Sequence, residues 1–366
     1  LVLALMLERL GYYGFRAEFV LVEQARGVEN QTSSQLLRML SFLVLIVPAF
    51  FAVVAIVIPR VWVGLGGAGL GALGLGLAVM GPQENLATAL VIFATGTGAV
   101  KACLAVAAAE FVDSVRARLV VLFVGYGAAN LAGFIAPFSL SPETTESFSR
   151  VPLFAMVGAL VLIALSAALS RVFPALPDVD RTVGPWGLTW LLTAPGILLL
   201  WVVSEGQVQP GAPPIWFFGL NPIAMSAGTM VLAPLFALVP ERLLRSLTMA
   251  ALVAGLPIVA VAASGVVSPP DELRVLAGAQ GALALAELCL VAFAMTLTVS
   301  LAPARLAPLS LAATALYASV SNRTGAWPIS WRLGAIAGLL VLSVLSTAVL
   351  GIFRKTTLAP LTPTAP

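Results

Sequence analysis

Six charged side chains lie inside stretches of sequence that are otherwise almost entirely apolar: Glu8, Arg9, Arg16, Glu18, Lys101 and Glu287. A charge in the core of a lipid bilayer costs at least about 2.5–3.5 kcal/mol, so such residues usually face a cavity or pair with one another. Arginine and lysine can hold a carboxylate, and a desolvated glutamate can hold an ammonium group or exchange a proton. This set therefore indicates binding of small charged solutes and protons inside a membrane.

Four of these charges share the segment MLERLGYYGFRAEF, residues 6–19. On a helix with about 100° per residue, one arc of about 140° holds five polar side chains: Glu8, Arg9, Tyr12, Tyr13 and Arg16. Gly11 and Gly14 fall on another side, where small residues allow helices to pack closely. The arc predicts the lining of a cavity. The alternative is a set of ion pairs that lock helices together.

The other intramembrane charges are isolated. Glu18 points away from the polar arc, so we expect it to reach the membrane surface or to pair locally. Lys101, in GTGAVKACLAV, and Glu287, in ALALAELCLVAF, must each find water, a ligand or an opposite charge. Tyr126 and Asn130 stand one helical turn apart and could donate hydrogen bonds from one face, although, taken alone, ordinary helix contacts explain them better.

Composition places the chain among membrane proteins. Of its 366 residues, 60% are hydrophobic and 10% are charged, whereas about a quarter of the residues in a soluble domain are charged. One membrane crossing needs roughly 20 apolar residues. Such runs occur at 1–24, 36–59, 62–80, 86–111, 117–139, 151–172, 186–204, 215–239, 246–267, 276–301, 305–322 and 332–353.

These runs predict an all-α polytopic membrane protein of the major facilitator fold, with about twelve transmembrane helices in two six-helix halves. We expect an N-terminal bundle over 1–172, a cytoplasmic linker over 173–185, a C-terminal bundle over 186–353 and a disordered tail over 354–366. More Lys and Arg fall in the loops on the side of the N-terminus, so both termini are predicted to be cytoplasmic.

Several function classes find no support in the sequence. The chain has no His, and its two cysteines lie in apolar runs, so His-based catalysis and a metal site of His and Cys ligands are not indicated. The net charge of +3 is explained by basic loops and does not indicate nucleic acid. We expect no enzyme activity, no cofactor and no metal.

Several motifs resemble those of the proton-coupled oligopeptide transporter family, in the same order along the chain. ERLGYYGFR is similar to the signature E-x-x-E-R-F-x-Y-Y-G of the first helix, with Leu5 at the first Glu of that signature. GTGAVKA, GYGAANLAGFIAP, GLNPIAMSAG and the AELCLVAF segment are similar to stretches of the fourth, fifth, eighth and tenth helices.

The resemblance implies the major facilitator fold and symport of di- or tripeptides, or similar small zwitterions, with protons across the bacterial inner membrane. It implies a proton-coupling set made of Glu8, Arg9, Lys101 and Glu287. It also implies a substrate-binding set made of Tyr13, Arg16, Lys101, Tyr126, Asn130, Asn221 and Glu287. The expected partners are the solute, protons and membrane lipid.

Two alternatives stay open. Leu5 in place of a carboxylate, and the short IPRVWVG loop where the family has a charged gating motif, also fit a transport-inactive scaffold subunit of a larger membrane complex. In that case the chain would bind partner membrane subunits. A carrier of another small anionic solute is the third hypothesis.

Overall fold

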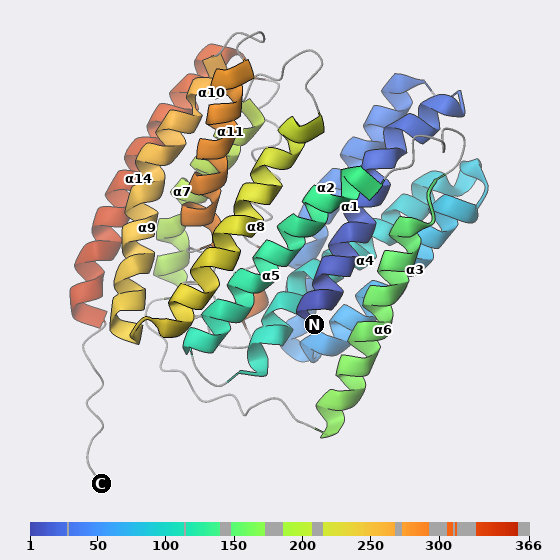
Figure 1. The fold of residues 1–366 in the computed structure, drawn as a ribbon, viewed down its shortest axis with the longest axis horizontal. Coiled ribbons are helices and arrows are strands. Elements are labelled where there is room, and N and C mark those ends of the chain that lie inside the picture. The colour runs from blue at the N-terminus through green and yellow to red at the C-terminus, as the bar shows by residue number, and fades with distance from the viewer. Residues whose placement is uncertain are drawn as a thin grey trace.

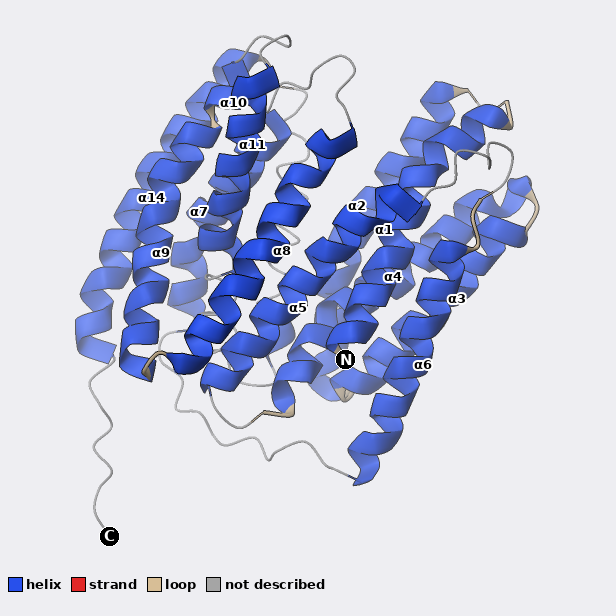
Figure 2. Cartoon of the chain, viewed as in Figure 1, coloured by secondary structure: helices blue, strands red, loops and turns tan. Residues whose placement is uncertain are grey.

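The computed structural model describes residues 1–27, 29–112, 115–139, 148–172, 186–206, 215–267, 273–292, 306–309, 312 and 327–357. Within these ranges every regular element is helical, and no strand is present (Figure 2). Eight of the described helices are long and apolar enough to cross a membrane. The chain is therefore a multi-pass α-helical membrane protein.

The first six helices follow the segments expected from the sequence. They are α1 (Val2–Ala25), α2 (Asn30–Val57), α3 (Arg60–Met80), α4 (Leu86–Glu110), α5 (Val115–Ile135) and α6 (Val151–Val172). Short 3-10 turns, η1 (Gln83–Asn85) and η2 (Ala136–Ser139), precede α4 and follow α5. Helix α2 begins six residues earlier than the apolar pattern suggested, because polar residues 30–35 extend the helix beyond the apolar run.

The remaining described helices are α7 (Trp186–Gly206), α8 (Ile215–Leu238), α9 (Glu241–Ala262), the short α10 (Ser264–Val267), α11 (Leu273–Glu287) with the π-helix η3 (Leu288–Ala292), and α14 (Ile329–Thr357). The expected linker 173–185 and most of the expected segment 305–322 lie outside the described residues. Helix α14 continues four residues beyond the predicted end at 353. The rest of the expected tail, 358–366, is outside the described residues.

Helix α1 is enclosed by the first half, where it packs against α2, α4, α5 and α6. This position shelters the charges of the helix from its surroundings: Glu8, Arg9, Glu18 and Glu23 are all buried. Gly11 and Gly14 face Pro152 at the start of α6, as the helical wheel predicted. The aromatic side chains of Phe15 and Phe19 fill the core beside them.

Helices α3 and α4 approach each other closely through glycines. A Cβ on Gly96 would collide with the backbone of Gly71 and Gly67, and one on Gly74 would collide with the backbone of Phe93. Gly69 on the same helix α3 has open space around it. The Gly-rich run 64–69 therefore serves close helix packing in part, and not every glycine in it is needed for that purpose.

Helices α5 and α8 form the main described contact between the two halves and run side by side in the middle of the molecule (Figure 1). The rings of Phe123 and Phe236 meet with their centroids 4.9 Å apart. The Ser226 hydroxyl lies 3.1 Å from the carbonyl oxygen of Gly127, to which it can donate. Arg116 donates to the carbonyl of Ala237 in the last turn of α8, at 3.3 Å. This α5–α8 seam holds the halves together.

Replacing Gly96 with Ala should lower the free energy of unfolding by about 1–3 kcal/mol, because overpacking a tight helix contact forces the backbones apart. Gly69→Ala is the matched control and should leave stability unchanged or slightly improved, since alanine favours helix. Thermal unfolding in detergent, followed by circular dichroism, measures both. Equal midpoints for the two variants would contradict this account of the α3–α4 contact.

Candidate functional site

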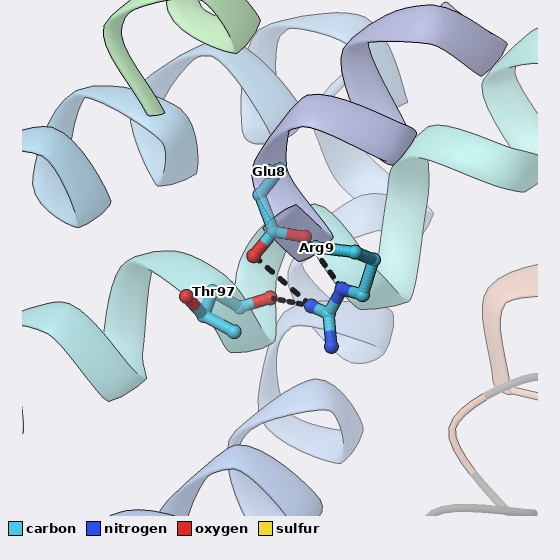
Figure 3. A network of polar contacts seen from close by, with 3 residues as sticks. All are labelled: Glu8, Arg9 and Thr97. Carbon is cyan, nitrogen blue, oxygen red and sulfur yellow. Dashed lines mark hydrogen bonds and ion pairs between the residues drawn. The ribbon is translucent and has the colours of Figure 1, made fainter. Parts of the chain in front are cut away.

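A buried ion pair on the first helix is also hydrogen-bonded to the fourth helix (Figure 3). Arg9 Nε lies 2.6 Å from Glu8 Oε2, and the Arg9 Nη2 lies 3.0 Å from Glu8 Oε1. The same Nη2 also donates to the backbone carbonyl of Thr97 on α4, at 3.5 Å. Glu8 is 0% exposed and Arg9 is 5% exposed. Both carboxylate oxygens are thus held by the guanidinium of the adjacent residue.

Additional groups surround this pair, which we call the α1–α4 cluster (Glu8, Arg9, Thr97 and Lys101). Lys101 follows Thr97 by one turn of α4 and is in electrostatic contact with Glu8 and Arg9. The Arg9 guanidinium lies 5.3 Å from the ring centroid of Tyr12. The cluster therefore combines two basic groups with a single carboxylate.

Leu5 occupies the position where the resemblance expects a second carboxylate. It is buried in an apolar group with Val100 and Leu104 of α4, on either side of Lys101 in the sequence, and with Ile163 of α6. A carboxylate at this place would have offered Lys101 a counter-charge. The leucine instead completes an apolar contact.

The second cluster, which we call the α5–α8–α11 cluster, consists of Tyr126, Asn130, Asn221 and Glu287. Tyr126 Oη donates a short hydrogen bond to Glu287 Oε1, and Asn221 Nδ2 donates to Glu287 Oε2 at 3.0 Å. Asn130 Nδ2 donates to the backbone carbonyl of Tyr126, at 2.9 Å, one turn earlier on α5. The carboxylate of the second half is thus held by one donor from α5 and one from α8.

The backbone after Glu287 changes from α-helix to the π-helix η3. Such π-turns are rare and often occur at functional sites. The following side chains fit against glycines of neighbouring helices: Leu288 against Gly228 of α8, and Leu290 against Gly255 of α9. These contacts fix the end of α11 and with it the carboxylate of Glu287.

Tyr13 and Arg16 lie between the two clusters. Tyr13 packs on Gly133 of α5 and is in electrostatic contact with Arg9, Arg16 and Glu287. Arg16 is exposed although it lies in the middle of α1. The predicted site residues therefore form two clusters joined by Tyr13, and Arg16 is the cation accessible beside them.

Two expectations from the sequence need correction. Not every residue of the polar arc of α1 lines an accessible cavity. Glu8 is fully buried, and Tyr12 is 4% exposed and packs near the ring of Phe93. Glu18 does not extend to an exposed position. It is buried, and its Oε2 accepts the backbone N–H of Ser149 at 2.7 Å, which fixes the segment before α6.

Sequence reasoning missed two contributors to the site. Thr97 offers its carbonyl to Arg9, and its spacing of one helical turn from Lys101 could have identified it. Ser226 bridges to Gly127 beside Tyr126, and nothing in its local sequence signals that contact. Within the described residues, no group of three His, Cys, Asp and Glu side chains could hold a metal ion.

The sequence matches no protein-family model and no curated protein, but the structure is similar to solved transporters. The E. coli fucose:proton symporter FucP matches with a TM-score of 0.65 at 14% identity, covering 98% of both chains. The POT family transporter PepTSo matches with a TM-score of 0.59 at 14% identity, covering 97% of both chains. A bacterial homologue of the iron transporter ferroportin, in an outward-facing state, matches with a TM-score of 0.67 at 14% identity, covering 96% of this chain and 98% of that one.

The chain has the major facilitator fold. The identities are too low for these matches to carry a substrate, and the three proteins differ in what their names say they transport. All three are described as transporters, and at these identities the likeness shows the fold alone.

Glu8→Gln should destabilise the protein by about 3–5 kcal/mol, because removing one partner of a buried pair leaves a guanidinium without its counter-charge. The double variant Glu8→Gln/Arg9→Gln should regain most of that loss. Thermal unfolding in detergent measures both. A double variant that is no more stable than the single one would contradict the pairing.

Proposed function

We propose that this protein transports small zwitterionic solutes, with di- and tripeptides as the substrate class, in symport with protons. The observation that carries the proposal is that Tyr13 interacts electrostatically with Arg16 of the first half and with Glu287 of the second half. Lys101, also of the first half, interacts with the neighbouring pair of Glu8 and Arg9. A zwitterion has a carboxylate that the cations of the first half could bind and an ammonium group that Glu287 of the second half could bind.

The part of the candidate site around Glu287 is suited to bind the ammonium group of the solute. Its carboxylate is held by two neutral donors and carries the negative charge of that cluster. Because Asn221 turns its amide nitrogen toward the carboxylate, Oδ1 faces away, and this buried oxygen has no hydrogen-bond donor among the described residues. An ammonium group has three N–H donors and could satisfy the amide oxygen and the carboxylate together.

The part of the candidate site formed by the first six helices is suited to bind the carboxylate of the solute. Arg16 is exposed and can offer a pair of N–H groups to one carboxylate. Lys101 lies beside a single carboxylate whose oxygens are already taken up by Arg9. These two cations would hold the carboxyl end of a zwitterion, with Tyr13 between the two ends.

Family membership and location complete the proposal. The motifs similar to those of the proton-coupled oligopeptide transporters, together with the structural similarity to PepTSo, support a divergent member of that family. We place the chain in a bacterial inner membrane with both termini in the cytoplasm, on the basis of its basic loops.

Uptake of a labelled dipeptide into proteoliposomes with an imposed proton gradient tests this function. Glu287→Gln and Arg16→Gln should each weaken dipeptide binding roughly 10-fold to 150-fold, since a hydrogen bond to a charged group contributes about 1.5–3 kcal/mol. Arg38→Gln is the matched control, because Arg38 is an exposed arginine on α2 away from both clusters. It should leave affinity unchanged.

Two results would contradict the proposed transport of dipeptides. No uptake by the parent protein, together with its purification in a fixed ratio with other membrane subunits, would replace the transporter with the scaffold hypothesis. Uptake of a simple carboxylate but not of the dipeptide would point to an anion carrier.

A further inference from the structure

The two buried carboxylates of the two clusters have different kinds of partner. Glu8 is held by a cation, with both oxygens accepting from Arg9. Glu287 is held by two neutral groups, the hydroxyl of Tyr126 and the amide of Asn221. This difference decides which carboxylate can gain a proton without disturbing its surroundings.

A proton on Glu8 would leave uncompensated charge inside the membrane. The guanidinium of Arg9 would lose the counter-charge that holds both of its hydrogen bonds to Glu8. Removing one member of a buried ion pair is strongly unfavourable, and the membrane interior adds to that cost.

A proton on Glu287 leaves no such charge. A hydroxyl can both donate and accept, so the new carboxylic O–H can donate to Tyr126 Oη where the hydroxyl donated before. The titratable groups in electrostatic contact with Glu287 within the described residues are Tyr126 from α5 and Tyr13 from α1, and α8 contributes the neutral Asn221. Protonation therefore removes a buried charge and keeps the contact.

The open oxygen of Asn221 allows the proton and the solute to be bound together. A single carboxylate cannot hold a proton and an ammonium group equally well at the same time. Asn221 Oδ1 lies on the same side chain that contacts Glu287 and has no donor in the described part of the chain. It remains an acceptor for a solute N–H when Glu287 is neutral.

We infer that Glu287 takes up the transported proton, that Glu8 is the fixed counter-charge of Arg9, and that Asn221 Oδ1 holds the solute N–H while Glu287 is protonated. This inference rests on the proposed function. The carboxylate gains one proton from the side where the solute enters and releases it on the other side, so one proton accompanies each solute.

The test compares two measurements on the same proteoliposomes, with the membrane potential clamped at zero by valinomycin and equal potassium. Accumulation of labelled dipeptide requires proton coupling, and counterflow exchange requires only solute binding and movement. The parent should accumulate the dipeptide about tenfold per unit of pH difference, the limit for one proton. Glu287→Gln should show no accumulation and a reduced but measurable counterflow.

Three further variants make the assignment specific. Glu8→Gln/Arg9→Gln should keep gradient-driven accumulation, and Glu8→Leu/Arg9→Met, which replaces the pair with apolar side chains, serves if the first double variant does not fold. Glu18→Gln controls for loss of another buried carboxylate of α1 and should behave like the parent. Asn221→Leu should lower counterflow roughly tenfold more at pH 5.5 than at pH 7.5, because the protonated site would lack an acceptor.

Each outcome bears on one claim. Accumulation by Glu287→Gln, or loss of accumulation with retained counterflow in the Glu8 variants, would overturn the inference while leaving the proposed function intact. Equal losses for Asn221→Leu at both pH values would overturn the role of the amide oxygen. Counterflow without accumulation in the parent would overturn the coupling, and absence of both would overturn the proposed function itself.

Discussion

The hydrogen bond between Tyr126 and Glu287 joins the two halves of the bundle at a buried carboxylate, and the arrangement of the α5–α8–α11 cluster depends on it. Glu287 ends α11, and the tyrosine that holds it belongs to α5 of the first half. The contact requires α5 and α8 to lie close together, which Gly127 and Ser226 allow. Any movement that separates the halves along this seam must release the carboxylate from the tyrosine.

Charge in the membrane interior explains why the two clusters differ. In the α1–α4 cluster the carboxylate of Glu8 and the guanidinium of Arg9 neutralise each other, so this ion pair changes little when a solute arrives. In the α5–α8–α11 cluster the charge is held by neutral donors and is open to neutralisation by a proton or by an ammonium group. The first arrangement is suited to holding helices, and the second to responding to what binds.

The fold and the burial of most of the intramembrane charges follow from the sequence, because apolar runs and charges within them are strong signals. The helices of the first half, the faces of Gly11 and Gly14, and the grouping of Tyr126 with Asn130 agree with the patterns from which they were predicted. The pairing of Glu8 with its own neighbour Arg9, the burial of Tyr12 and the contact of Glu18 with Ser149 could not be predicted. A helical wheel gives the direction of a side chain but not which helix lies opposite it or which rotamer brings two groups together.

The central claim concerns one carboxyl group, and infrared difference spectroscopy observes that group directly. Acidifying the reconstituted protein should produce the C=O stretching band of a protonated carboxylic acid. The band should be missing in Glu287→Gln and retained in Glu8→Gln/Arg9→Gln. A band that persists in Glu287→Gln and disappears in the double variant would contradict the account and assign the proton to the first helix.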